Sequence, residues 1–166
     1  MCDFKRSKKG ISFKMYDEDR KYDNLKLKKQ LCFPLYAVTN LITKKYKDYL
    51  IKLNLTYTQY IIMMALWEEG CLTMGELTKK LFLGSSTVSP VLQRLEEKEY
   101  VEKCFLEEDE RVTVVMLTDK GEALKDEALK IPKEMKKYFS LEDEEEAELH
   151  RILYKILERE EKSKKK

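Results

Sequence analysis

The stretch LTMGELTKKLFLGSSTVSPVLQRLEEKEYVEKCFLEEDERVTVVMLT, residues 72–118, decides the fold of this chain. The tetrapeptide TMGE at 73–76 reads as a capping box that opens a short helix, because a hydroxyl caps the first turn and a glutamate three residues later reaches back. After Gly84, which stands where a helix stop belongs, the hydroxyl cluster at 85–87 offers the cap of a second helix. Apolar residues along one side of that helix recur at three- and four-residue steps: Val88, Val91, Leu92 and Leu95.

The second half of the stretch predicts a hairpin. Residues 100–106 and 112–117 are β-prone runs, and the polar tip at 107–111 separates them. Two short helices followed by a hairpin form the order of a winged helix-turn-helix. The predicted fold is therefore mainly α with a small β-hairpin wing.

Longer helices are predicted on both sides of this stretch. Apolar residues at helical steps indicate one helix over residues 27–53, which begins or bends at Pro34 because proline removes a backbone donor. Capping boxes at 56–59 and 140–143 open two more helices, and Pro132 marks a bend before the last one. These helices carry more apolar surface than one small domain needs, so we expect amino- and carboxy-terminal helices to form the interface of a homodimer.

Composition excludes several classes of function. The 166 residues suit a single core, and the absence of a long apolar run together with a charged amino terminus predicts a cytoplasmic protein without a membrane segment. The cysteines form no CxxC pair, and His150 is the one histidine. We therefore expect no metal site, no cofactor and no enzyme. Cys71 and Cys104 are expected to be packed rather than reactive.

The polar face of the second helix is suited to DNA. Hydroxyl, amide and guanidinium groups can bind base edges and phosphates, and a helix amino terminus itself favours phosphate. An arginine near the hairpin tip fits a narrow minor groove. The sequence is equally consistent with a helix that binds no DNA, in which the hydroxyls cap the first turn and the polar face is solvated. The expected DNA-binding residues are Ser85, Ser86, Thr87, Ser89, Gln93, Arg94, Asp109 and Arg111.

The charge of this region argues in the other direction. Residues 84–120 contain five basic and nine acidic residues, a net charge of −4. Phosphate neutralisation normally dominates DNA affinity, so Lys79, Lys80 and the basic amino-terminal arm would have to contribute. A winged helix that meets a protein instead of DNA therefore stays open as an alternative.

Four segments resemble the MarR family of dimeric winged-helix regulators, over roughly residues 29–157. They are QLCF at 30–33, LNLTYTQY at 53–60, the run at 85–96, and DER at 109–111 followed by Leu117-Thr118. The DER wing is typical of the whole family. The first two segments are similar to its organic-hydroperoxide-sensing, OhrR-like branch with one reactive cysteine.

The resemblance implies a redox switch. Cys32 matches the peroxide-reactive thiol, Tyr46 and Tyr57 match tyrosines that hydrogen-bond its thiolate across the dimer interface, and Tyr36 lies nearby. Oxidation would give a sulfenic acid and then a mixed disulfide with a small thiol. The implied function is a repressor that leaves a pseudo-palindromic double-stranded operator when Cys32 is oxidised.

The chain departs from the branch at three positions. Pro34 replaces an aliphatic residue, Gly84 an aspartate that precedes the recognition helix, and Gln93 a common lysine. One alternative is a regulator of the same family that binds a small aromatic ligand between the reading head and the dimer helices, with Cys32 inert. A buried structural cysteine is the other interpretation of Cys32.

The expected organisation follows chain order. A flexible basic extension over 1–25 precedes a first dimerisation helix over 26–55. The winged helix-turn-helix DNA-binding region covers 56–118, carboxy-terminal dimerisation helices cover 119–160, and a charged tail covers 161–166.

Overall fold

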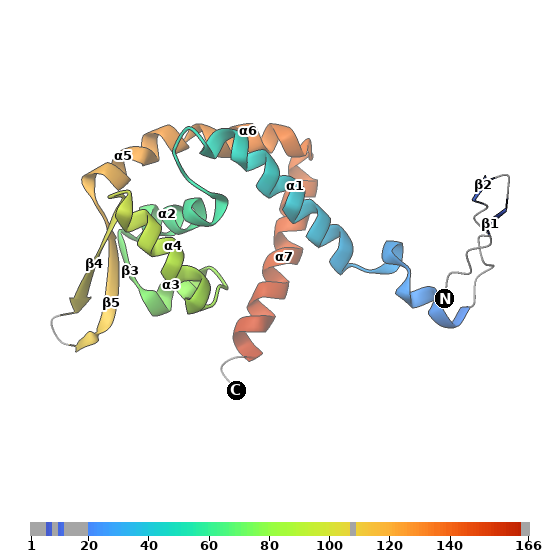
Figure 1. Cartoon of the computed structure of the whole chain (residues 1–166), viewed down its shortest axis with the longest axis horizontal. Coiled ribbons are helices and arrows are strands. Elements are labelled where there is room, and N and C mark those ends of the chain that lie inside the picture. The colour runs from blue at the N-terminus through green and yellow to red at the C-terminus, as the bar shows by residue number, and fades with distance from the viewer. Residues whose placement is uncertain (1–5, 8–9, 12–19, 107–108, 164–166) are drawn as a thin grey trace. The chain divides into compact units, whose positions relative to one another are not determined.

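The computed structural model describes residues 6–7, 10–11, 20–106 and 109–163 and confirms the predicted fold class (Figure 1). The chain divides into two compact units, Met1–Ile42 and Thr43–Lys166, and each is described by itself. Most of the described elements are helices, and the second unit also contains a small three-stranded sheet. Among the described residues, no helix combines the length and apolarity that a membrane crossing requires.

In the described part of the first unit, short elements precede the long helix. Strands β1 (Arg6–Ser7) and β2 (Gly10–Ile11) pair, and two 3-10 turns, η1 (Arg20–Leu25) and η2 (Leu27–Lys29), follow. Residues 1–5, 8–9 and 12–19 of the predicted basic extension lie outside the described residues, as do 164–166 of the charged tail.

Helix α1 (Cys32–Leu50) is shorter than the predicted helix at both ends. Pro34 is its third residue, where a backbone amide has no partner within the helix and the missing donor costs nothing. The helix therefore begins near Pro34 rather than bending there.

Two of the predicted capping boxes are present. In α2 (Tyr57–Glu69) the box joins Thr56 and Gln59, and in α3 (Met74–Lys80) it joins Thr73 and Glu76. Gly70 ends α2 with a φ of 81°, a left-handed conformation that favours glycine. These ends were predictable because capping depends on local sequence.

The start of α4 (Ser85–Glu97) differs from the prediction. Gly84 is its N-cap residue, with φ −73° and ψ 152°, and no side chain caps the helix. The predicted cap by the hydroxyl cluster is therefore wrong, because Ser85 already lies inside the first turn and its neighbours follow it there. The serine and threonine hydroxyls are free of that role.

The wing contains one strand more than predicted. Strands β4 (Val101–Leu106) and β5 (Asp109–Leu117) form the expected hairpin, and β3 (Cys71–Thr73) adds antiparallel to β5, giving the order β3-β5-β4. In Figure 1 the hairpin extends beyond α3 and α4 as a wing. A three-residue strand is too short to leave a period-2 pattern in the sequence.

The carboxy-terminal helices are α5 (Asp119–Ala128), α6 (Lys130–Phe139) and α7 (Asp143–Ser163). Pro132 lies in the first turn of α6, so the break falls just before it. The prediction that Ser140 caps α7 is wrong. Ser140 ends α6 with a φ of 50°, and its hydroxyl donates to the Lys137 carbonyl. At the start of α7, the backbone amide of Glu142, the residue before the helix, donates to the side chain of Glu145.

The core of the second unit lies between α2, α4 and the sheet. Tyr60, Ile62, Met63 and Leu66 of α2 are buried, and so are the apolar stripe of α4 and Val101 and Val115 of the sheet. Burying such side chains stabilises the folded chain by roughly 1.5–3 kcal/mol each. This core therefore fixes which face of α4 remains outside.

Candidate nucleic-acid interface and sensing residues

Packing of α4 decides which of its side chains face solvent. Val88, Leu92 and Leu95 are fully buried, so the opposite face of the helix is exposed. The exposed side chains of α4 include all its predicted DNA-binding residues: Ser85, Ser86, Thr87, Ser89, Gln93 and Arg94. The structure therefore gathers them on one surface at the beginning and middle of the helix.

Ion pairs with glutamates neutralise several lysines on the elements around α4. Lys103 pairs with Glu96 at 2.6 Å, Lys120 with Glu99 at 3.0 Å, and Lys80 with Glu69 at 2.6 Å. Within the described part of this reading head, Lys79 and Arg94 are exposed cations without a hydrogen bond or an ion pair. The positive charge open to an anion is thus concentrated on α3 and α4.

The wing residues lie on strand β5. Asp109 pairs with Leu106 of β4 beside a register shift between Phe105 and Leu106, and Arg111 follows two residues later. The side chains of Asp109 and Arg111 lie outside the described residues, so their predicted contacts with DNA stay predictions.

Two of the predicted sensing tyrosines lie together. The ring centroids of Tyr46 on α1 and Tyr57 at the start of α2 are 4.9 Å apart, and Tyr60 lies 5.7 Å from Tyr46. Burial, and then the neighbouring Tyr57 and Tyr60, raise the pKa of Tyr46 to about 12. Burial also raises the pKa of Tyr57 and Tyr60. All three are therefore neutral phenols at physiological pH, and each can donate its O–H.

The predicted thiol and its nearby tyrosine belong to the first unit. Cys32 is the first residue of α1 and carries an exposed free thiol, and Tyr36, one turn later, is 68% exposed. Cys71 and Cys104 are also free and exposed, because they lie on the outer face of the wing sheet. The expectation that these two are packed is therefore wrong.

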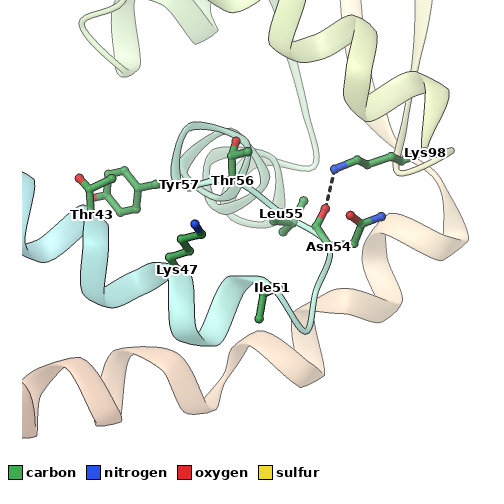
Figure 2. A pocket seen from close by; sticks show the side chains of 8 residues that line it. All are labelled: Thr43, Lys47, Ile51, Asn54, Leu55, Thr56, Tyr57 and Lys98. Atoms are coloured by element: carbon green, nitrogen blue, oxygen red, sulfur yellow. Dashed lines mark hydrogen bonds between the residues drawn. The ribbon is translucent and has the colours of Figure 1, made fainter.

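A pocket of about 350 Å³ lies beside the tyrosine pair (Figure 2). A small-ligand site was one alternative that the sequence left open, but the sequence did not indicate the lysines that line this pocket. It contains two lysines and no carboxylate, and its walls come from α1, the loop before α2, the start of α2 and the end of α4. The residues that line it are Thr43, Lys47, Ile51, Asn54, Leu55, Thr56, Tyr57 and Lys98. The sequence singles out two of the lining residues, Thr56 as a helix cap and Tyr57 as a sensing tyrosine.

Comparisons with known proteins agree with this geometry. The family model described as "Transcriptional regulator SarA/Rot" matches residues 44–128. The chain is 39% identical to the organic hydroperoxide resistance transcriptional regulator of Bacillus subtilis (strain 168) over 140 residues, which cover 84% of this chain and 95% of that protein.

Solved structures show the same similarity. The structure of reduced AbfR bound to DNA has a TM-score of 0.69 and 29% identity, and the match covers 84% of this chain and 97% of that one. A mutant of MarR from E. coli complexed with operator DNA has a TM-score of 0.65 and 26% identity, over 76% and 95% of the two chains. The chain therefore belongs to the MarR family of winged helix-turn-helix transcriptional regulators, in the organic-hydroperoxide-sensing, OhrR-like branch.

Proposed function

We propose that this protein is a dimeric repressor that leaves its operator when a peroxide oxidises Cys32. The observation that carries the proposal is the half-buried pair of neutral phenols, Tyr46 and Tyr57, whose ring centroids lie 4.9 Å apart. Phenol O–H groups can donate hydrogen bonds to a thiolate, which favours the charged form of the thiol. Regulation rather than catalysis is proposed because the relatives are transcriptional regulators.

The exposed face of α4 supports binding to DNA. Its hydroxyls, Gln93 and Arg94 can reach base edges and phosphates in a major groove, and Lys79 on α3 can add a phosphate contact. Asp109 and Arg111 take the wing contacts that the family resemblance implies. Relatives with the same fold have been solved with DNA bound, which agrees with this assignment.

Exposed apolar side chains support the homodimer. Leu149, Ile152 and Ile156 repeat along one side of α7 and are each more than 40% exposed. The first helix exposes a further set, Leu35, Val38 and Leu41. A second copy of the chain can bury both sets, and two reading heads then face a pseudo-palindromic site. The tyrosine pair of one protomer would receive Cys32 of its partner, as the resemblance implies.

The proposed switch begins with nucleophilic attack. The thiolate sulfur of Cys32 attacks one peroxide oxygen of an organic hydroperoxide, the O–O bond breaks, and the other oxygen takes a proton and leaves as an alcohol. A small thiol then attacks the sulfenic acid, which forms a disulfide and releases water. The first step removes the negative charge of the thiolate, and both steps add bulk near the phenol donors. The altered packing then shifts the reading heads.

A gel shift with operator DNA tests this function. Wild-type protein is expected to leave the operator when an organic hydroperoxide is added, and Cys32→Ser is expected to stay bound. Cys71→Ser and Cys104→Ser are matched controls because their thiols are also free and exposed, and both should respond as wild type does. Release of Cys32→Ser at the wild-type peroxide concentration would falsify the assignment of the sensor.

The pocket favours a second candidate function, a regulator that responds to a small aromatic acid with Cys32 inert. Lys47 and Lys98 would hold the acid group, while Ile51 and Leu55 would contact the ring. Volumes of this size accommodate small organic ligands. In this case Cys32→Ser would still be released from DNA by the aromatic acid, and Lys47→Met would not.

A further inference from the structure

Lys98 lies at the end of the DNA-reading helix and points back toward the start of α2. It is the residue that follows the last turn of α4, and its ammonium donates to the Asn54 carbonyl at 2.5 Å (Figure 2). The same ammonium donates to Gln59 Oε1 at 3.0 Å. It thereby joins α4 to the loop between α1 and α2 and to α2 itself.

The partners of Lys98 are unusual for a lysine of this protein. Lys80, Lys103 and Lys120 pair with carboxylates, whereas both acceptors of Lys98 are neutral oxygens. Burial, and then the nearby Arg94, lower the pKa of Lys98. A partly desolvated ammonium whose acceptors are neutral gains no ion-pair energy from them, but its charged hydrogen bonds are strongly directional. Its geometry therefore depends on where those two oxygens lie.

Gln59 ties Lys98 to the tyrosine pair. The Gln59 side chain is 2% exposed, and its Oε1 also accepts the Thr56 amide at 3.0 Å as part of the capping box of α2. Tyr57 lies inside that same box, in the first turn of α2. A movement of this turn that displaces the Tyr57 ring must therefore also displace the acceptor of Lys98.

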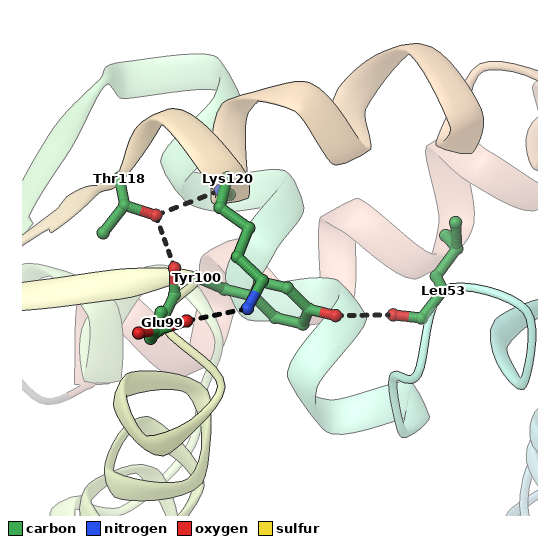
Figure 3. A network of polar contacts seen from close by, with 6 residues as sticks. Leu53, Glu99, Tyr100, Thr118 and Lys120 are labelled. Carbon is green, nitrogen blue, oxygen red and sulfur yellow. Dashed lines mark hydrogen bonds and ion pairs between the residues drawn. The ribbon is translucent and has the colours of Figure 1, made fainter.

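Space for such a movement exists beside the turn. The pocket of about 350 Å³ is lined by both Tyr57 and Lys98, so neither side chain is held by packing on that side (Figure 2). The preceding loop is fixed separately, because the hydroxyl of buried Tyr100 donates to the Leu53 carbonyl at 3.4 Å (Figure 3). Lys120 covers the Tyr100 ring and pairs with Glu99, which holds this corner in place.

We propose that Lys98 is a positioning residue that couples the tyrosine pair to the DNA-reading helix through Gln59. The proposal rests on the proposed function for its biological purpose, but the coupling itself runs in both directions. Because such coupling is reciprocal in free energy, a change at Tyr57 that alters DNA affinity implies that operator DNA bound at α4 shifts the conformational equilibrium at Tyr57 by the same free energy.

Fluorine NMR on the full chain labelled with fluorotyrosine measures the coupling without any oxidant. The Tyr57 signal is assigned by Tyr57→Phe, and operator DNA is expected to shift it in the wild-type protein. In Lys98→Met, at saturating operator, less than about half of that shift should remain. Lys98→Arg retains the donor and should rescue the shift. The proposal is overturned if operator DNA does not shift the Tyr57 signal of the wild-type protein, or if it shifts the signal of Lys98→Met as far as that of wild type.

The peroxide response gives the second readout. Peroxide is expected to raise the operator dissociation constant of the wild-type protein by a certain factor, and in Lys98→Met this factor should be about tenfold smaller. The affinity of the reduced variant for the operator should differ from that of the reduced wild type by less than about threefold. Lys103→Met is the matched control, because it removes a lysine of the same head that pairs with Glu96 instead, and its factor should equal that of wild type. An unchanged factor in Lys98→Met contradicts the coupling.

Two further outcomes separate the proposals. If peroxide does not release the wild-type protein but the NMR shift depends on Lys98, the redox function fails and the coupling stands. If Lys98→Met does not fold, Gln59→Glu replaces it, because a glutamate retains the capping box and gives Lys98 a charged acceptor. That variant should keep at least the wild-type shift at Tyr57, and loss of the shift overturns the coupling.

Discussion

The carbonyl of Tyr100 occupies the space beside Gly121 where any other residue would carry its Cβ. Gly121 lies in the first turn of α5, and Tyr100 precedes strand β4. The Gly121 carbonyl in turn accepts the indole N–H of Trp67 at 3.0 Å, so α5 is held against both the wing and α2. The absence of a side chain at residue 121 allows this close approach.

Gly121→Ala is therefore expected to destabilise the protein by about 2 kcal/mol or more, since the added methyl group overlaps backbone that cannot move freely. The free energy of unfolding from urea titration checks this. Gly75→Ala is the matched control, because a Cβ there meets only Thr73 Oγ1 at 3.9 Å. That variant should be about 0.5 kcal/mol more stable than wild type. Equal effects at both positions would contradict the packing argument.

Removal of the Arg94 guanidinium should weaken operator binding by roughly tenfold to hundredfold, the range for one arginine contact with DNA. Arg94 is exposed on α4 and has no ion pair, so its charge is open to DNA. The measurement is fluorescence anisotropy with Arg94→Ala at several salt concentrations. Lys103→Ala removes a charge that Glu96 already neutralises, and it should bind nearly as wild type does. A larger loss in the control than in Arg94→Ala would place the contact elsewhere.

A charge on the apolar side of α7 should separate the dimer. Ile152 is 42% exposed between Leu149 and Ile156, and a second copy would bury all three. Ile152→Lys is expected to lower the sedimentation mass to that of a monomer and to weaken operator binding, because one head alone reads half a site. Glu158→Lys lies on the opposite side of the helix and should remain dimeric. Persistence of the dimer in Ile152→Lys would argue against this face.

Stability should fall in strongly alkaline solution through the buried phenols. The pKa of Tyr46 rises from 10.0 to about 12 in the folded chain, so the neutral phenol is favoured there. The resulting stabilisation is complete below pH 10 and is lost as pH approaches 12. Urea unfolding across this range should show a shallower decline in Tyr46→Phe. Identical pH profiles for the two proteins would show that Tyr46 titrates normally.

Local sequence determined several elements of this protein. The capping boxes at Thr56 and Thr73 are present, because the groups that satisfy the first-turn amides lie within three residues of each other. The apolar stripe of α4 and the hairpin were predictable for a similar reason, since periodicity reports the buried face directly.

Predictions failed where two local solutions competed. Ser140 has the residue type of an N-cap, yet its hydroxyl closes the preceding helix, because the chain turns there in a left-handed conformation. Gly84 has the residue type of a helix stop, yet it is the N-cap residue of α4, which begins at Ser85. In both cases the neighbouring helix, and not the residue itself, decides which end is capped.

The sequence by itself determined the fold class and the face of α4 that is open to DNA, because both depend on residues close together in the chain. Only the tertiary structure decided that Tyr46 lies against Tyr57, and that Lys98 reaches Gln59 across 39 residues of sequence. Contacts between distant segments leave no periodic signal. They arise when α2 packs against α1 and against α4 and desolvates polar groups, which must then find partners in whichever segment lies beside them.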